Sequence, residues 1–192
     1  NINKKIIKIT QNNSNDWILF SNMNLAEWNI LFIGKQSNNI NLPQNFNNYG
    51  FTGCVNFFNV NFDNMRFDLK NGHCEDSLNI VNSNGFIKSI DIQNAFSDAL
   101  DIDFSNIKID ELIVNKAGND CSDFSGGQYK VNISNLNYCG DKGISVGEKS
   151  YIELNKLFVY NSAIGIASKD SSISYITDAY FENVNNAQSH LF

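Results

Sequence analysis

Short runs in which apolar and polar side chains alternate recur along most of the chain. Alternation over four to eight residues predicts half-buried β-strands, because successive side chains of a strand point to opposite faces. The clearest runs are LNIV (78–81), IKSIDI (87–92), LDIDF (100–104), IKIDELIV (107–114), YKVNI (129–133), YIEL (151–154), LFVY (157–160) and SISYI (172–176). Asn, Asp, Ser and Gly, the residues that turns favour, separate these runs. The pattern predicts an all-β protein.

The chain repeats itself about every 22 residues from Cys54 onward. Four aspartates fall 22, 22 and 21 residues apart, namely Asp76, Asp98, Asp120 and Asp141. The phrases GISVGEKS (143–150) and GIASKDSS (165–172) are two copies of one element. A fixed register of individual side chains is typical of a solenoid whose coils stack about 4.8 Å apart. We therefore predict a parallel β-helix of roughly 6–8 coils, with about 22 residues per coil.

Residues 1–53 repeat less clearly than the rest of the chain. We expect them to form irregular N-terminal coils and a cap, because an open solenoid end exposes unpaired backbone. The polar stretch Ser37–Asn41 is the best loop candidate in this region. Residues 54–186 are expected to form the regular β-helix, and 187–192 a short tail within the same single domain. The chain begins at Asn1 without a secretory leader, so we expect a processed chain or a fragment of a longer one.

Strand alternation also assigns the side chains that face the interior. The predicted core consists of Leu78, Ile80, Leu100, Ile102, Phe104, Ile109, Phe124, Val131, Ile133, Ile144, Val146, Ile152, Leu154, Ile166 and Ile173.

The chain contains 34 asparagines. Asparagine tolerates left-handed backbone angles and stacks into amide ladders, so it suits the turns of a β-helix. The candidates for this role are Asn82, Asn106, Asn115, Asn135 and Asn161. A genome of low GC content would also enrich asparagine, and both causes stay open.

Charge and hydropathy exclude two classes of partner. The net charge is −6 and the only arginine is Arg66, which argues against nucleic acid. No apolar run approaches the roughly 20 residues that a membrane-spanning helix needs. We therefore expect neither a nucleic-acid partner nor a membrane span, whereas an open coil end would allow oligomerisation.

The chain has four cysteines, an even number that fits an oxidising compartment. Cys54 and Cys74 lie 20 residues apart, and Cys121 and Cys139 lie 18 apart, slightly less than one coil. One turn of the solenoid would return each pair to nearly the same corner, within the Cα separation of about 4.4–6.8 Å that a disulfide needs. We predict both disulfides and a secreted, periplasmic or cell-surface location. The alternative is four buried free thiols.

The repeating coils of residues 54–186 resemble the right-handed parallel β-helix, or pectin-lyase-like, superfamily. The phrases GNDCSDFSGG (118–127), CGDKGISVGEKS (139–150) and GIASKDSS are similar to those of uncharacterised bacterial β-helix repeat proteins. The wider superfamily includes polysaccharide lyases, glycoside hydrolases, C5-epimerases, esterases, adhesins and phage tailspikes. The resemblance implies the fold and does not choose among these functions.

Aspartates are the main chemical signal of the repeat. Beside the recurring column lie Asp101, Asp103 and Asp123, and stacking would bring column neighbours to about 5 Å from one another. Carboxylates this close raise each other's pKa unless a cation or a proton intervenes. Three roles follow. A calcium ion would bind among Asp98, Asp101, Asp120 and Asp123. A carboxylate pair would act as acid and base, or nucleophile, on a sugar. Alternatively, the aspartates would cap backbone amides at a repeated turn.

A mixed-charge group follows the acidic column. Lys142 comes directly after it, Glu148 and Asp170 would stack one coil apart, and Lys169 is adjacent. A lyase or epimerase needs a base for the proton α to a uronate carboxyl group, and a lysine of lowered pKa would serve. A lyase also needs a cation that stabilises the enolate, and Arg66 is the only arginine. Arg66 lies three to four coils from Lys142, too far to act on the same sugar ring, which weakens the lyase hypothesis. The alternative is a surface ion-pair ladder worth at most about 1 kcal/mol per pair. The candidate catalytic residues are Asp98, Asp120, Asp123, Asp141, Lys142, Glu148, Lys169 and Asp170.

The histidines and tyrosines carry weaker signals. His73 and His190 are the only histidines, so a histidine-dependent nucleophile would have to use one of them. Tyrosines recur through the later coils as Tyr129, Tyr138, Tyr151, Tyr160, Tyr175 and Tyr180. Exposed tyrosines would stack on sugar rings, although the wall or core of a coil is their commoner place.

Two functions from different classes follow from these patterns. The first is an extracellular β-helix that interacts with a polysaccharide or cell-surface glycan, as a lyase, epimerase or hydrolase that uses clustered Asp, Glu and Lys. The second is a non-catalytic structural or adhesion module, such as a surface shaft, an adhesin or a viral tail segment. The shortness of the chain favours the second function, and the charged residues between 98 and 170 favour the first.

Overall fold

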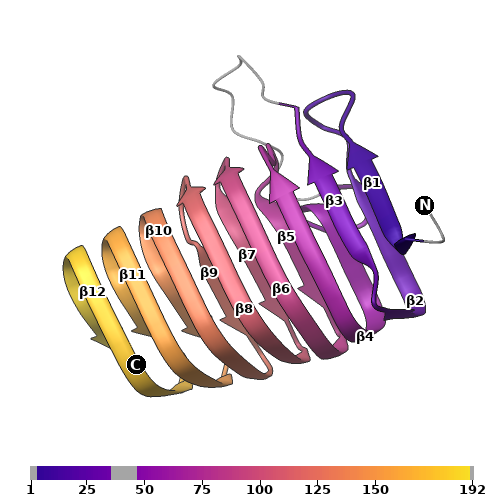
Figure 1. The fold of residues 1–192 in the computed structure, drawn as a ribbon. Helices are drawn as coiled ribbons and strands as arrows, with labels where there is room; N and C mark the ends of the chain where they lie inside the picture. The colour runs from indigo at the N-terminus through magenta and orange to yellow at the C-terminus, as the bar shows by residue number, and fades with distance from the viewer. Residues whose placement is uncertain (1–3, 36–46, 191–192) are drawn as a thin grey trace.

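The computed structural model describes residues 4–35 and 47–190. The chain forms an all-β parallel solenoid of about 8 turns, with successive turns about 22 residues apart. Figure 1 shows the coils stacked from β1 at the N-terminal end to β12 at the C-terminal end. The predicted parallel β-helix is therefore confirmed. The predicted loop at Ser37–Asn41 lies outside the described residues.

All strand pairs of the described chain are parallel. The strands are β1 (Ile6–Thr10), β2 (Ile18–Ala26), β3 (Asn29–Ile33), β4 (Gly53–Lys70), β5 (Asp76–Val81), β6 (Asn84–Ala95), β7 (Asp98–Asp103), β8 (Asn106–Ala117), β9 (Ser122–Ser125), β10 (Gln128–Gly147), β11 (Tyr151–Ser168) and β12 (Ile173–His190).

The long strands of the later coils follow the same path as pairs of shorter strands in the earlier ones. The first part of β10 pairs with β8 and its last part pairs with β9. At the N-terminal end, β2 pairs with the beginning of β4 and β3 with its end. From β4 onward each coil therefore presents the same sequence of faces, and a residue 22 or 23 positions along the chain occupies the same column. The residues of β2 and β3 instead pair with β4 residues that lie 37 positions further along.

The interior is one apolar cluster that runs the length of the solenoid. Of the predicted core, all residues are buried except Phe104, Ile133 and Ile173. Phe104 has a φ of 47°, and this left-handed angle at a corner turns its side chain outward. Ile133 follows Asn132, and both face away from the core because the strand alternation changes phase there. Ile173 pairs with Tyr151 in an outward-facing column.

Asparagine occupies several of the corners, as predicted from its abundance. Asn82 and Asn161 have φ values of 49° and 54°. Asn161 donates to Asn137 at 2.9 Å and accepts from Asn183 at 3.1 Å, which forms an amide ladder. The other three candidates are not left-handed, although Asn106 Nδ2 donates to Asn84 Oδ1 at 3.2 Å. Stacked amides therefore help to hold the register of the coils.

Both predicted disulfides are present. The Cα atoms of Cys54 and Cys74 lie 5.4 Å apart, and those of Cys121 and Cys139 lie 5.2 Å apart. Each bridge joins one coil to the next, as the spacing of slightly less than one coil predicts. Two disulfides are typical of proteins that fold in an oxidising compartment.

In the described part of the chain, no helix is long and apolar enough to cross a membrane.

Candidate functional site

The predicted acidic column exists, with one correction. Asp76 pairs with Asp98, and the backbone N–H of Asp120 donates to the carboxylate of Asp98. The next member of the column is Lys142, whose backbone N–H donates to Asp120 Oδ1 at 2.9 Å. Asp141 therefore does not continue the column, because it lies one residue short of the 22-residue step that Lys142 completes.

Two of the candidate carboxylates hold the backbone of the next coil. Asp98 Oδ1 accepts from the backbone N–H of Asp120 at 2.8 Å and from Asn119 Nδ2 at 2.8 Å. Asp120 Oδ1 accepts the corresponding bond from Lys142. These contacts are those of the turn-capping role that was one of the three alternatives. Burial is the largest influence on the Asp120 carboxyl group and raises its pKa to about 6, against the attraction of Lys142.

Lys142 is held as a cation. Its Nζ lies 3.3 Å from Asp120 Oδ2 and also forms an ion pair with Asp141. Burial alone would lower the pKa of Lys142, but the hydrogen bonds and charges of Asp141 and Asp120 outweigh it and raise the pKa. A general base needs a lowered lysine pKa, so the electrostatics here oppose that role.

A second group of carboxylates lies on the outer face of the same sheet. Asp101 of β7 pairs in register with Asp123 of β9, and Asp103 lies two residues along β7. Asn79 Nδ2 donates to Asp101 Oδ2 at 3.1 Å, and Lys169 Nζ lies 3.8 Å from Asp123 Oδ2. We call Asp101, Asp103 and Asp123 the outer acidic cluster.

Two members of the outer acidic cluster have pKa values above the usual range for aspartate. Burial, followed by repulsion from Asp123 and Glu148, raises the pKa of Asp103 to about 6. Burial and then the charges of Asp76 and Asp103 raise the pKa of Asp101 well above its ordinary value. Asp103 lies beside the predicted column but is not among the site residues predicted from the sequence. Its position two residues after Asp101 was the available signal, because strand alternation puts both on one face.

An exposed aromatic side chain adjoins this cluster. Phe104 directly follows Asp103 and is 59% exposed, and its ring covers Gly126, where an added Cβ would lie 2.4 Å from it. The left-handed φ of Phe104 belongs to a corner that recurs in each coil, because Asn82 and Gly126, one coil to either side, also have positive φ. Glu148 and Asp170 occupy the same corner in later coils with φ values of 56° and 54°. The corner thus combines an aromatic surface with carboxylates.

The aspartates do not form a ready metal site. Among residues 4–35 and 47–190, no three His, Cys, Asp or Glu side chains form a group that could hold a metal ion. Calcium at Asp98, Asp101, Asp120 and Asp123 therefore gains no support, because Asp98 and Asp120 already accept backbone hydrogen bonds.

A groove lies on a different face of the solenoid. It has a volume of about 660 Å³ and is lined by four neighbouring strands, β6, β8, β10 and β11. Its side chains include Phe86, Lys108, Gln128, Lys130, Tyr151 and Glu153. We call it the lysine groove. None of the candidate catalytic residues lines it.

Of the two lysines in the lysine groove, Lys130 forms an ion pair, whereas Lys108 forms none with the described residues. Lys130 Nζ lies 2.7 Å from Glu153, and the Tyr151 hydroxyl donates to Glu153 at 3.3 Å. Lys108, one coil from Lys130, is exposed and is in none of the ion pairs of the described chain. These lysines are absent from the candidates predicted from the sequence, although their spacing of 22 residues was visible there.

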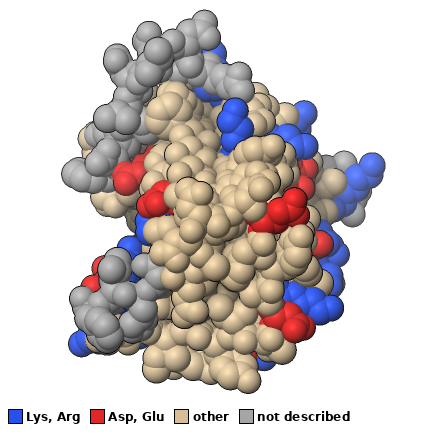
Figure 2. All heavy atoms as spheres, turned by 90° about the vertical axis from the view of Figure 1, so that its left-hand side faces the viewer, with Lys and Arg blue, Asp and Glu red and all other residues tan. Residues whose placement is uncertain are grey.

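The tyrosines divide between the interior and the surface. Tyr129 is buried, and its hydroxyl lies within hydrogen-bond distance of the backbone carbonyls of Ser125, at 2.7 Å, and Ile102, at 2.9 Å. Tyr138, Tyr151, Tyr175 and Tyr180 are exposed. Charged side chains lie mainly along the sides of the solenoid, as Figure 2 shows in a view onto the β12 end, where the middle of the visible face is uncharged.

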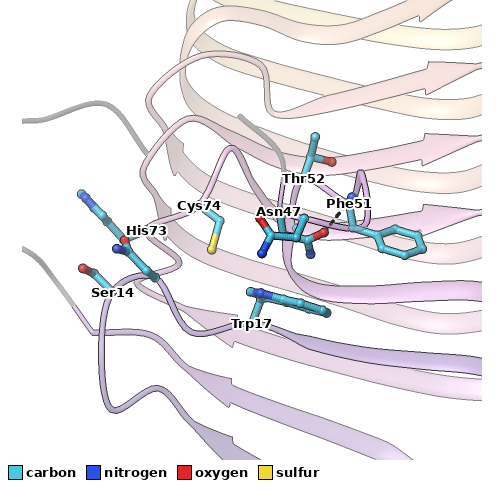
Figure 3. A pocket seen from close by; sticks show the side chains of 10 residues that line it. Ser14, Trp17, Asn47, Phe51, Thr52, His73 and Cys74 are labelled. Atoms are coloured by element: carbon cyan, nitrogen blue, oxygen red, sulfur yellow. Dashed lines mark hydrogen bonds between the residues drawn. The ribbon is translucent and has the colours of Figure 1, made fainter. Parts of the chain in front are cut away.

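A smaller cavity of about 130 Å³ lies near the N-terminal end, lined by His73, Trp17 and Asn47 among others. Figure 3 shows Trp17, Asn47 and Cys74 gathered at its centre. The other histidine, His190, lies at the end of β12.

Comparisons with known proteins do not identify a family. No family model, no curated protein sequence and no solved structure matches this chain significantly. The fold is therefore shown by the structure alone, and the pectin-lyase-like superfamily stays a resemblance.

Proposed function

We propose that the protein is an extracellular β-helix that binds a linear anionic polysaccharide along the lysine groove. The observation that carries this proposal is a groove of about 660 Å³ that crosses four neighbouring strands and therefore follows the solenoid axis. Stacked strands lie about 4.8 Å apart, close to the rise of one pyranose unit in an extended glycan. Each sugar unit of an extended polymer can therefore contact one coil of the solenoid.

The chemistry of the groove suits a sugar that carries a negative charge. Tyr151 is 40% exposed and offers a ring on which the apolar face of a pyranose can stack. Gln128 adds amide donors and acceptors, and Lys108 supplies a cation for a carboxylate or sulfate. The outer acidic cluster would repel the same polymer, so the lysine groove, rather than the aspartate column, is the binding surface in this proposal.

Binding measurements on matched lysine variants test the proposal. Lys108→Gln should weaken the binding of polygalacturonate about tenfold, because it removes one charge-assisted contact. Lys8→Gln, which changes an exposed lysine on β1, should leave the affinity unchanged. Added salt should weaken wild-type binding by screening. Equal losses in both variants, or equal affinity for an uncharged glucan, would contradict the proposal.

A second candidate function is hydrolysis of an uncharged polysaccharide at the outer acidic cluster, on a surface separate from the lysine groove. The observation that favours it is the pKa of about 6 for Asp103 beside Asp123 and the exposed Phe104. Asp103 would donate a proton to the glycosidic oxygen, and Asp123 would act as base or nucleophile. Among the expected chemistries, hydrolysis needs only carboxyl groups, whereas a lyase or epimerase needs a base that Lys142 does not supply.

Product analysis separates hydrolysis from binding alone. An active enzyme should release new reducing ends from an uncharged polysaccharide such as a glucan, and Asp103→Asn should abolish the release while leaving the binding of polygalacturonate in the lysine groove intact. The control variant Asp91→Asn, on the outer face of β6, should keep full activity. Binding without release of products from any polymer would make the protein a non-catalytic adhesion module, the other function expected from the sequence.

A further inference from the structure

The N-terminal cavity has the features of a binding site that is separate from the lysine groove. Its described lining contains no Asp, Glu, Lys or Arg, and the pKa of His73 is lowered by burial, so the cavity is neutral. Ser14 and Thr52 contribute hydroxyl groups, and Trp17 contributes an indole ring. The lining therefore suits an uncharged ligand that combines an apolar face with several hydroxyl groups.

Asn47 carries a hydrogen-bond donor that has no partner in the described chain. Its Oδ1 accepts from the backbone N–H groups of Tyr49 at 2.8 Å and Phe51 at 3.2 Å. These two bonds fix the orientation of the amide, because a flipped amide would turn its own N–H groups toward two donors. Asn47 Nδ2 is then buried without a hydrogen-bond acceptor. A buried unsatisfied donor is unfavourable, and an oxygen atom of a ligand would satisfy it.

An aromatic pair lies at the edge of the same cavity. Trp17 is 37% exposed, and the ring of Tyr49 meets it edge-on with centroids 5.7 Å apart. Figure 3 shows Trp17 beside Asn47, with His73 and Ser14 to one side and the Phe51 ring pointing away. An indole of this kind is a stacking surface for the C–H face of a sugar ring.

We propose that the cavity formed by Trp17, Asn47 and His73 binds a single neutral pyranose, such as a terminal sugar of a glycan. The sugar would stack on Trp17 and accept a hydrogen bond from Asn47 Nδ2, with His73 and Ser14 available to its remaining hydroxyl groups. A volume of about 130 Å³ admits one ring rather than a chain. The site is independent of the lysine groove, which lies on β6, β8, β10 and β11.

Tryptophan fluorescence tests this site directly. Trp28→Phe leaves Trp17 as the only tryptophan, because the chain has two. Titration of this variant with methyl glucoside, methyl galactoside and methyl N-acetylglucosaminide should produce a saturable change in emission with at least one of them. The second substitution Asn47→Asp keeps an acceptor for Tyr49 and Phe51 but removes the donor, and it should weaken that binding about tenfold.

Two controls make the outcome decisive. Tyr151→Ala removes a ring of the lysine groove and should leave monosaccharide binding unchanged, so the failure of either site is seen separately. Circular dichroism confirms that each variant keeps its β-structure. The proposal would be overturned if none of the three glycosides changed the emission, or if the Asn47→Asp variant bound the active glycoside as tightly as its parent. Either result would mean that the cavity is filled by water and does not bind a sugar.

Discussion

At the residue scale, the aspartates of the repeating coils have different structural roles that depend on the column they occupy. Asp98 and Asp120 accept backbone N–H groups of the next coil, and each therefore holds a turn. Asp101 and Asp103 face outward, where burial and neighbouring charges raise their pKa values. Asp76 is buried and its Oδ2 has no hydrogen-bond partner among the described residues, and its pKa is raised well above the ordinary value.

These raised pKa values predict that the protein loses stability as the pH rises. The folded-state pKa of Asp103 and of Asp120 is about 6, above the ordinary aspartate value of 3.8. A group with a raised pKa binds its proton more tightly in the folded state, so its contribution is fully present below the unfolded pKa and is lost as the pH rises through about 6.

Thermal melting between pH 4 and 8 measures this effect. We expect the melting temperature to fall by several degrees as the pH rises from about 5 to about 7.5. Asp103→Asn should flatten the dependence, because it removes one titrating group. Asp178→Asn, on the outward side of β12, should leave it unchanged. A melting temperature that is constant or increases over this range would contradict the prediction.

At the scale of the strands, the disulfides connect coils where short strands meet corners. Cys121 precedes β9, and Cys139 lies within β10, the strand that pairs with β9. Cys54 lies near the start of β4 and Cys74 precedes β5, its neighbour in the sheet. Each bridge therefore fastens the corner that leads into a short strand.

Removal of the second bridge should destabilise the protein without changing the fold. The double variant Cys121→Ser and Cys139→Ser should lose about 3 kcal/mol of unfolding free energy in urea, because the unfolded chain regains the entropy of an 18-residue loop. Counting thiols in denatured, unreduced wild-type protein is the direct check. Zero reactive thiols agrees with both bridges, and four would rule them out.

At the scale of the whole molecule, one core runs through all the coils. Ile102 is fully buried and pairs with Ile80 on one side and Phe124 on the other, both also fully buried. A stacked core of this kind makes every coil depend on its neighbours, because each repeat buries its apolar face only against the next.

A charge placed inside this core should unfold the chain. Ile102→Asp would bury a carboxylate between apolar neighbours, at a cost that exceeds the stability of an ordinary domain of this size. Ile173→Asp makes the same chemical change at a side chain that is 61% exposed and should be nearly neutral. Melting temperatures and circular dichroism of the two variants check this. Similar behaviour of the pair would mean that the inward and outward positions are assigned wrongly.

The sequence by itself determined the coil, its length and the disulfide pairs. A period of 22 residues and strand alternation are local properties that every coil repeats, and stacking turns them directly into neighbours such as Cys121 and Cys139. Most of the core followed for the same reason. Two of the exceptions, Phe104 and Ile133, lie where the backbone turns a corner or the alternation changes phase, and alternation alone cannot indicate such positions.

Only the tertiary structure decided which side chains share a surface. A shift of one residue in the coil replaced Asp141 by Lys142 in the acidic column and turned a proposed base into a paired cation. The lysine groove depends on the shape left between side chains of four strands, and the neutral cavity on a turn that orients the Asn47 amide. Both depend on register and packing in three dimensions, which a repeat in the sequence does not specify to within one residue.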